Sequence, residues 1–221
     1  MAVKVDRRIK IPQTTVRRLS IYYRVLKALE RESGDGNQTV SSEDIAALAG
    51  TNAAQVRRDL TYFGQFGKRG VGYKVSELKA YLAEILGIDR EWLIALVGVG
   101  NLGSALLAYR GLPEQGFRIC AAFDRDPAKI GRQIGDVLVY DVADLVRVVR
   151  EKKISMAIIA VPAHAAQDVA DRLVEAGIKG ILNFAPVQLI VPDDVTVSNV
   201  DLAIEMEGLS YALTHGGWHE L

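Results

Sequence analysis

Cysteine and histidine are scarce in this chain of 221 residues. Its single cysteine, Cys120, cannot form a disulfide within the chain, and no Cys or His spacing typical of a metal site occurs. The N-terminus lacks the apolar core of a signal peptide, and no apolar run approaches the roughly 18 residues of a membrane span. These absences predict a soluble, cytoplasmic protein that holds no metal.

Net charge is also absent, but only as an average over the whole chain. Residues 1–80 contain 15 Lys and Arg against 8 Asp and Glu, whereas residues 81–221 contain 12 against 19. A basic segment joined to an acidic one indicates that only the first part meets a polyanion such as DNA. Small helical domains are often somewhat basic, so the charge alone also fits a first domain that binds no nucleic acid.

The first part of the chain has helical spacing. Apolar side chains recur at intervals of three and four over residues 14–32, which predicts a helix with one buried face. A serine cap at Ser41–Ser42 and a cap at Thr51 predict two further short helices that end at Gly50 and near residue 63. Aromatic residues among the glycines that follow favour a tight β-hairpin, or wing.

Two short helices joined at Gly50 form a helix-turn-helix, whose second helix would read base edges in the major groove. The predicted DNA-contacting residues are polar or basic and lie on that helix or at the hairpin tip. They are Asn52, Gln55, Arg57, Arg58, Lys68 and Arg69. Each of these charges alone is better explained as a solvated surface residue; only the combination predicts DNA binding.

The pattern changes after residue 88. Continuous apolar runs alternate with helical segments, which is typical of a parallel sheet covered by helices on both faces. The runs are LIALVGV (93–99), FRICAAFD (117–124), SMAIIAV (155–161) and KGILNF (179–184). The sequence therefore predicts an α/β protein in which a winged helix precedes a doubly wound sheet.

A dinucleotide-binding fingerprint opens this second part. Gly98-Val99-Gly100-Asn101-Leu102-Gly103 follows an apolar strand and begins a helix. The first glycine permits the turn, the second lets a pyrophosphate approach the backbone, and the third lets helix and strand pack closely. Asp124 ends the next strand, where an acid accepts hydrogen bonds from ribose hydroxyls and repels a 2′-phosphate. The prediction is NAD(H), with CoA or an empty glycine-rich turn as alternatives.

Taken together, these segments resemble the Rex family of redox-sensing transcriptional repressors over nearly the whole chain. The motifs RRDLTYFG-FGKRGVGY and GIKGILNFAP carry the resemblance more specifically than the glycine motif does. The resemblance implies a homodimer with a domain-swapped C-terminal helix that binds palindromic operator DNA and releases it when NADH replaces NAD⁺. The implied domains are residues 1–87 (winged helix), 88–200 (Rossmann) and 201–221 (swapped helix and tail).

The residues favour a sensor over an enzyme. His164 is the one catalytic candidate, and it is better explained as a residue at a helix start that lines the crevice. An NAD-dependent oxidoreductase with an appended basic domain stays open as an alternative, as does a regulator that binds CoA.

Two hypotheses describe how the sensor would work. Phe184 and the loops VPAHAA and NFAP would favour the uncharged reduced nicotinamide, because burying an unpaired positive charge is costly. Arg24, Tyr109 and Asp201 would form a hydrogen-bonded contact that depends on the bound cofactor and links the two domains.

Overall fold

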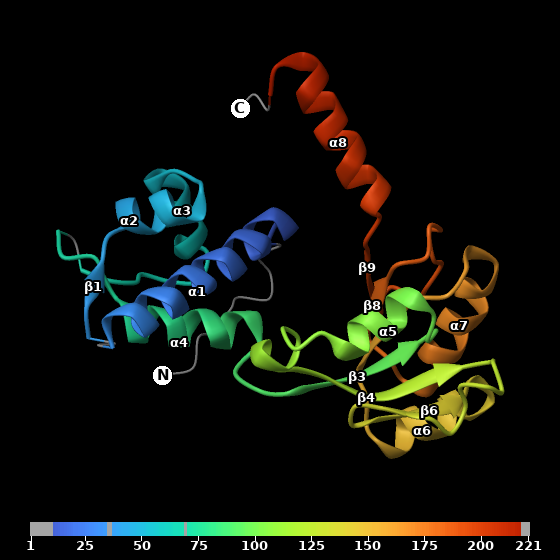
Figure 1. Ribbon diagram of the computed structural model, residues 1–221. Helices are drawn as coiled ribbons and strands as arrows, with labels where there is room; N and C mark the ends of the chain where they lie inside the picture. The colour runs from blue at the N-terminus through green and yellow to red at the C-terminus, as the bar shows by residue number, and fades with distance from the viewer. Residues whose placement is uncertain (1–10, 35–36, 69, 218–221) are drawn as a thin grey trace. The chain divides into compact units, whose positions relative to one another are not determined.

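The computed structural model describes residues 11–34, 37–68 and 70–217, and the chain forms two compact units (Figure 1). Unit 1 is Met1–Arg90 and unit 2 is Glu91–Leu221. The division falls three residues after the predicted boundary at residue 87. Residues 201–221 belong to unit 2, so their separation as a third segment stays a prediction.

Unit 1 is helical with one small two-stranded sheet. Its elements are α1 (Gln13–Ser33), β1 (Thr39–Val40), α2 (Ser42–Ala49), α3 (Ala53–Thr61), β2 (Tyr73–Lys74) and α4 (Val75–Leu86). Helix α1 packs against α4 and α2, and α2 packs against α3. The buried side chains Leu19, Tyr22 and Leu26 form the predicted apolar face of α1, whereas Val16 is exposed.

The start of each short helix is set by one polar side chain. The Ser41 hydroxyl accepts from the Asp44 N–H at 3.0 Å, and the Asp44 carboxylate accepts from the Ser41 N–H, which confirms the predicted serine cap. The predicted cap at Thr51 is wrong. The Thr51 N–H still bonds to Ala46 O at the end of α2, so the cap of α3 is Asn52.

The predicted hairpin between α3 and α4 is shorter than a full wing. The N–H and carbonyl of Lys68 pair with those of Gly72 at 3.0 and 3.1 Å, which closes a tight loop. Beyond that loop, β2 pairs antiparallel with β1, so the strand after the loop is held by the segment before α2.

Unit 2 is a seven-stranded sheet with strand order β5-β6-β4-β3-β7-β8-β9. The strands are β3 (Trp92–Val97), β4 (Phe117–Asp124), β5 (Gln133–Ile134), β6 (Val137–Asp141), β7 (Met156–Ile159), β8 (Gly180–Asn183) and β9 (Thr196–Asn199). All neighbours are parallel except β5, which is antiparallel to β6. The four predicted strands form the centre of this sheet, with β3 in the middle.

Helices cover both faces of the sheet, as predicted. Helices α6 (Leu145–Glu151) and α7 (Ala163–Ala176) bury their apolar sides against one face. Helix α5 (Asn101–Ala108) covers the other face, together with the loop that carries Leu112. Short 3₁₀ turns at Pro113–Gln115 and Val142–Asp144 complete the connections. The chain thus forms a helical N-terminal unit, followed in the sequence by a unit with a Rossmann-like parallel sheet.

A last helix, α8 (Leu202–His215), follows β9 and begins at the Asp201 cap, whose carboxylate accepts from the Ala203 N–H at 2.9 Å. The C-terminal helix is therefore present. None of its side chains is buried in the described part of this chain. Its large apolar side chains are all at least half exposed; they are Leu202, Ile204, Met206, Leu209, Tyr211 and Leu213.

Among the described residues, no helix combines the length and apolar character needed to cross a membrane. The same residues contain no group of three or more His, Cys, Asp or Glu side chains arranged to hold a metal ion.

Ser41→Ala tests the capping box of α2. We expect a loss of about 1 kcal/mol in the free energy of unfolding, because the Asp44 N–H loses its side-chain acceptor and the Asp44 carboxylate loses the Ser41 hydroxyl as a donor. Urea unfolding of the full chain, followed by circular dichroism, measures the loss. Ser210→Ala, at an exposed position within α8, is the matched control. An unchanged midpoint for Ser41→Ala would contradict the assignment.

Candidate functional site

The glycine turn between β3 and α5 is the tightest part of unit 2. Gly98 has φ +97°, and a Cβ there would lie 2.4 Å from Ala160 O, at the end of the neighbouring strand β7. A Cβ on Gly103 would lie 2.0 Å from Gly98 O. These two positions admit only glycine because backbone approaches backbone.

Gly100 differs from both, because a Cβ there would meet no atom within 4 Å. Gly100 is the residue before α5, and no side chain caps the first turn of this helix. The free N–H groups and the partial positive charge of the helix end therefore face open space. The fold itself does not require a glycine here, but a phosphate group approaching the backbone does. This turn fits a dinucleotide.

The Asp124 carboxylate is fixed at the end of β4 by three donors. It accepts from the Val99 N–H at 2.8 Å, the Asp126 N–H at 3.0 Å and the Lys129 ammonium at 3.1 Å. Burial raises the pKa of Asp124, but these hydrogen bonds and the Lys129 charge outweigh burial and hold the pKa below its usual value. Asp124 is thus an ionised acceptor joined to the glycine turn.

A cavity of about 1020 Å³ opens beside this turn. It is bounded by the glycine turn, the end of β4, the end of β7 and α7 as far as Arg172. Its lining includes the predicted residues Gly98, Gly100 and Asp124. Val99, Asn101, Leu102 and Gly103 belong to the same turn but do not line the cavity.

Phe184 lies elsewhere in unit 2. It is half-buried, packs against the apolar cluster on the α5 side of the sheet, and does not line the cavity. Its contact with a nicotinamide ring stays a prediction. His164 is exposed in the first turn of α7 and does not line the cavity either, although its neighbours Val161, Pro162 and Ala165 do.

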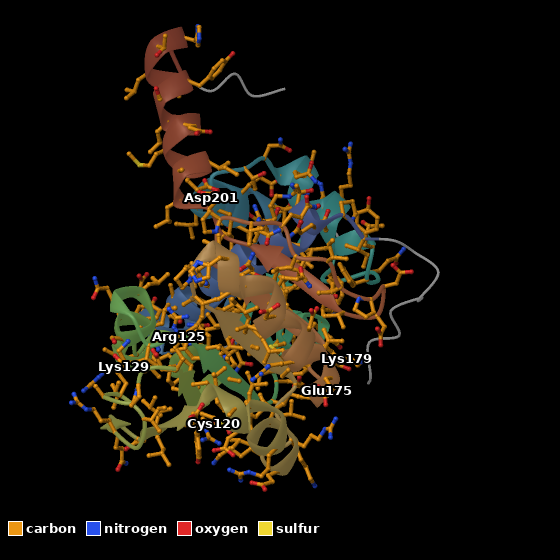
Figure 2. All side chains as sticks on the ribbon, turned by 90° about the vertical axis from the view of Figure 1, so that its right-hand side faces the viewer. Cys120, Arg125, Lys129, Glu175, Lys179 and Asp201 are labelled. Atoms are coloured by element: carbon orange, nitrogen blue, oxygen red, sulfur yellow. The ribbon has the colours of Figure 1, made fainter. Side chains whose placement is uncertain are left out.

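Sequence reasoning missed two basic side chains of the cavity, Lys129 and Arg172. Arg125 and Lys129, both labelled in Figure 2, follow β4, and Arg172 comes from α7. The five-residue spacing from Asp124 to Lys129 is the signal that could have identified the ion pair. The lining also contains Asp124, Asp126, Asp168 and Asp171, so the basic side chains give the cavity local positive groups but no positive excess.

Cys120 lies half-buried in the middle of β4, and its thiol faces Ile94 O at 3.8 Å (Figure 2). Burial raises the pKa of this thiol. A thiol with a raised pKa carries little thiolate at neutral pH and is a poor nucleophile. Redox chemistry at this cysteine is therefore disfavoured.

On unit 1, the predicted DNA-contacting residues of α3 have different surroundings. Asn52 uses its side-chain oxygen as the helix cap, and Arg58 is exposed. Arg57 pairs with Glu43 at 3.0 Å and with the Ser42 hydroxyl at 2.7 Å. Arg57 is therefore held against α2 and is not a free side chain.

The other residues predicted to contact DNA are Lys68 and Arg69, which precede β2 in the sequence, and Gln55, which lies in the first turn of α3. Lys68 is exposed on the tight loop, and Arg69 lies outside the described residues. Gln55 is half-buried and donates from its amide nitrogen to Asp59 at 2.8 Å. The structure thus brings Gln55 to Asp59, a residue that the sequence did not single out.

Asp59 is fully buried between α3 and α1. Arg18 donates to both of its oxygens, at 2.6 and 2.7 Å, and the Tyr22 hydroxyl donates at 2.9 Å. Thr15 adds a weaker bond at 3.3 Å. Burial raises the pKa of Asp59, but the hydrogen bonds from Arg18, Gln55 and Tyr22 and the Arg18 charge lower it overall. The carboxylate is ionised and joins the two helices.

The predicted switch residues belong to both units. Arg24 is exposed on α1 in unit 1, whereas Tyr109, exposed after α5, and Asp201, the cap of α8, belong to unit 2. Their mutual contact stays a prediction.

Two family models match the chain. A "CoA binding domain" model matches residues 89–187, and a model described as "Putative DNA-binding protein N-terminus" matches residues 10–61.

Curated relatives match over nearly their whole length. The redox-sensing transcriptional repressor Rex of Desulforamulus reducens is 51% identical over 205 residues, which are 93% of this chain and 96% of the relative. Rex of Carboxydothermus hydrogenoformans is 54% identical over 202 residues, which are 91% and 96% of the two chains.

Solved structures agree with these relatives. The chain resembles RSP, a Rex-family repressor, in its complex with β-NAD⁺ and operator DNA, with a TM-score of 0.88, 38% identity and 94% of each chain covered. It resembles RSP bound to β-NADH with a TM-score of 0.83 and 37% identity, covering 94% of this chain and 96% of RSP.

Gly100→Ala separates ligand binding from folding. We expect the variant to unfold at the wild-type temperature, because its Cβ meets open space, and to bind NADH about tenfold or more weakly in calorimetry. Gly103→Ala is the contrasting control, because its Cβ meets Gly98 O and lowers the unfolding temperature. Wild-type NADH affinity in Gly100→Ala would refute the phosphate site.

Proposed function

The chain belongs to the Rex family of redox-sensing transcriptional repressors, and we propose that it binds a palindromic operator with unit 1 and releases it when NADH replaces NAD⁺ in unit 2. Repression of transcription, rather than catalysis, is the function of this family. The observation that carries the cofactor proposal is the open turn at Gly100, which lies beside a cavity and an anchored Asp124.

In this proposal the adenosine end of the dinucleotide lies at Asp124. The carboxylate has three donors, so its remaining acceptor capacity is available to a ribose hydroxyl. Its negative charge disfavours a 2′-phosphate, although the nearby Arg125 and Lys129 weaken that effect. The pyrophosphate would accept from the N–H groups at the start of α5.

Discrimination between the two redox states then depends on charge. NAD⁺ carries a positive nicotinamide ring and NADH a neutral one. Val161 and Pro162 give the cavity an apolar border at the start of α7, and no side chain caps this helix. An apolar border and a positive helix end both disfavour a cation. Phe184 would add a further apolar contact.

DNA binding would use α3 and the loop before β2. Arg58 and Lys68 are exposed and suited to phosphate contacts, and residues 1–80 carry the excess of basic side chains. RSP, which covers 94% of this chain at 38% identity, is the relative solved with operator DNA. Arg69 stays in this proposal as a second basic residue of the loop.

A homodimer completed by an exchanged α8 is the assembly we propose. Helices α6 and α7 cover one face of the sheet, whereas α5 is the one helix that packs on the other among the described residues. Each chain therefore has an apolar helix, α8, without a covering partner in the chain, and such a face favours burial against a second copy. Arg24, Tyr109 and Asp201 would link cofactor state to the DNA-binding unit at this junction.

One experiment tests the function against its alternative. We expect a fluorescent palindromic operator to stay bound with NAD⁺ or CoA added and to dissociate with NADH. Release by CoA instead, as the CoA binding domain match allows, would replace NADH as the effector. Equal release by NADH and NAD⁺ would refute redox sensing. Asp201→Ala is expected to retain NADH binding but to lose NADH-dependent release.

Met206→Glu with Leu209→Glu tests the role of α8. Both side chains are already exposed in the single chain, so the substitutions cost little if the protein is monomeric. If the helix is exchanged, they bury two charges, and we expect sedimentation to show monomers at concentrations where the wild type is dimeric. Leu138→Glu, at an exposed position of β6, is the control. A dimer unaffected by the α8 substitutions would exclude the exchange.

A further inference from the structure

We propose that Asp59 fixes the direction of the Gln55 carboxamide, so that α3 offers its oxygen to the DNA and selects adenine at one position of each operator half-site. The inference rests on the proposed use of α3 as the recognition helix. To that proposed function it adds the base that Gln55 recognises and the buried residue, Asp59, that sets the direction of the Gln55 amide.

The direction of the amide follows from the chemistry of its partner. An ionised carboxylate only accepts hydrogen bonds, so the group that faces Asp59 must be the amide nitrogen of Gln55. That nitrogen lies 2.8 Å from Asp59 Oδ1. Rotating the amide by half a turn would place its oxygen against a buried negative charge. The oxygen of Gln55 is therefore the end turned away from Asp59.

Asp59 cannot turn away to release this constraint. Arg18 holds both carboxylate oxygens, and Tyr22 holds Oδ2 from the same helix. The carboxylate is fully buried, and the Arg18 side chain is mostly covered. Turning the Asp59 carboxylate away would leave a buried charge without these donors, which would strongly destabilise the folded state. The carboxylate therefore keeps its orientation toward Gln55.

Gln55 also lies where a recognition helix reads bases. It is the third residue of α3, in the turn that enters the groove first. Among the described residues, none donates a hydrogen bond to its side-chain oxygen. Asn52, one turn earlier, has its side-chain oxygen occupied by the Gln55 N–H. Gln55 is thus the better-placed acceptor of the two amides.

An outward oxygen selects a base with an exocyclic amino group. In the major groove, adenine presents its N6 amino group and cytosine its N4 amino group, whereas guanine presents only acceptors. The Gln55 amide nitrogen keeps a second hydrogen after bonding Asp59. That hydrogen can donate to N7, which adenine has and cytosine lacks at this edge. The favoured partner is therefore adenine.

The test begins with an operator selected from random palindromic duplexes by the wild-type protein. Each adenine of the half-site is then replaced by nebularine, the analogue without the 6-amino group. We expect one position at which this change weakens binding about 10- to 100-fold. In Gln55→Met, the same replacement should cost nothing, while the penalties at other positions remain.

Two further variants separate base reading from general binding. Lys68→Ala should weaken binding to every duplex and leave the nebularine penalty intact, because a phosphate contact carries no base preference. Asp59→Asn should weaken the preference for adenine over guanine at that position. An Asn amide can accept or donate, so the Gln55 amide can rotate by half a turn and present its nitrogen to guanine.

Other outcomes overturn the inference. A nebularine penalty that persists in Gln55→Met, or a Gln55-dependent preference for guanine, shows that the oxygen is not the reading group. If Asp59→Asn does not fold, the Gln55→Met comparison alone decides. If the wild type selects no duplex at all, the proposed DNA binding fails and the inference fails with it, which is a different result from selection without a Gln55-dependent position.

Discussion

Unit 1 depends on one buried negative charge. Asp59 is fully buried, and such a charge is tolerated only when donors replace water around it. Arg18, Tyr22 and Thr15 supply donors from α1, and Gln55 supplies one from α3 itself. Because the donors must meet both carboxylate oxygens, the angle and register between α1 and α3 are fixed, and the face of α3 that meets solvent is fixed with them.

The ligand turn of unit 2 depends on two glycines that have no Cβ atom. Gly98 and Gly103 let three backbone segments meet at the end of β3, and this close approach directs the α5 N-terminus toward the cavity. The Val99 N–H then bonds Asp124 across the gap to β4. The turn and the acid form one rigid group before any ligand arrives, so little ordering is required when a dinucleotide binds.

The sequence predicts the elements whose pattern is local. The central strands β3, β4, β7 and β8 are continuous apolar runs because both of their faces are buried, and their glycine turn has a fixed spacing. The strands β5, β6 and β9 were missed because they lie at or near the sheet edges and are short or partly polar. The partners of Asp59 were missed for another reason: Arg18 and Asp59 are separated by 41 residues, and only the tertiary structure brings them together.

The ionised state of Asp59 has a consequence for when the protein responds. Its pKa and that of Asp124 are lowered, while those of Tyr22 and Cys120 are raised. A lowered carboxyl pKa contributes stability that is complete above the ordinary value and is lost only as pH falls below it. These four groups therefore keep one protonation state near neutral pH. The two carboxylates that organise the sites therefore keep their charge through small changes in pH near neutrality, so the geometry that they hold does not mix acidity with the redox signal.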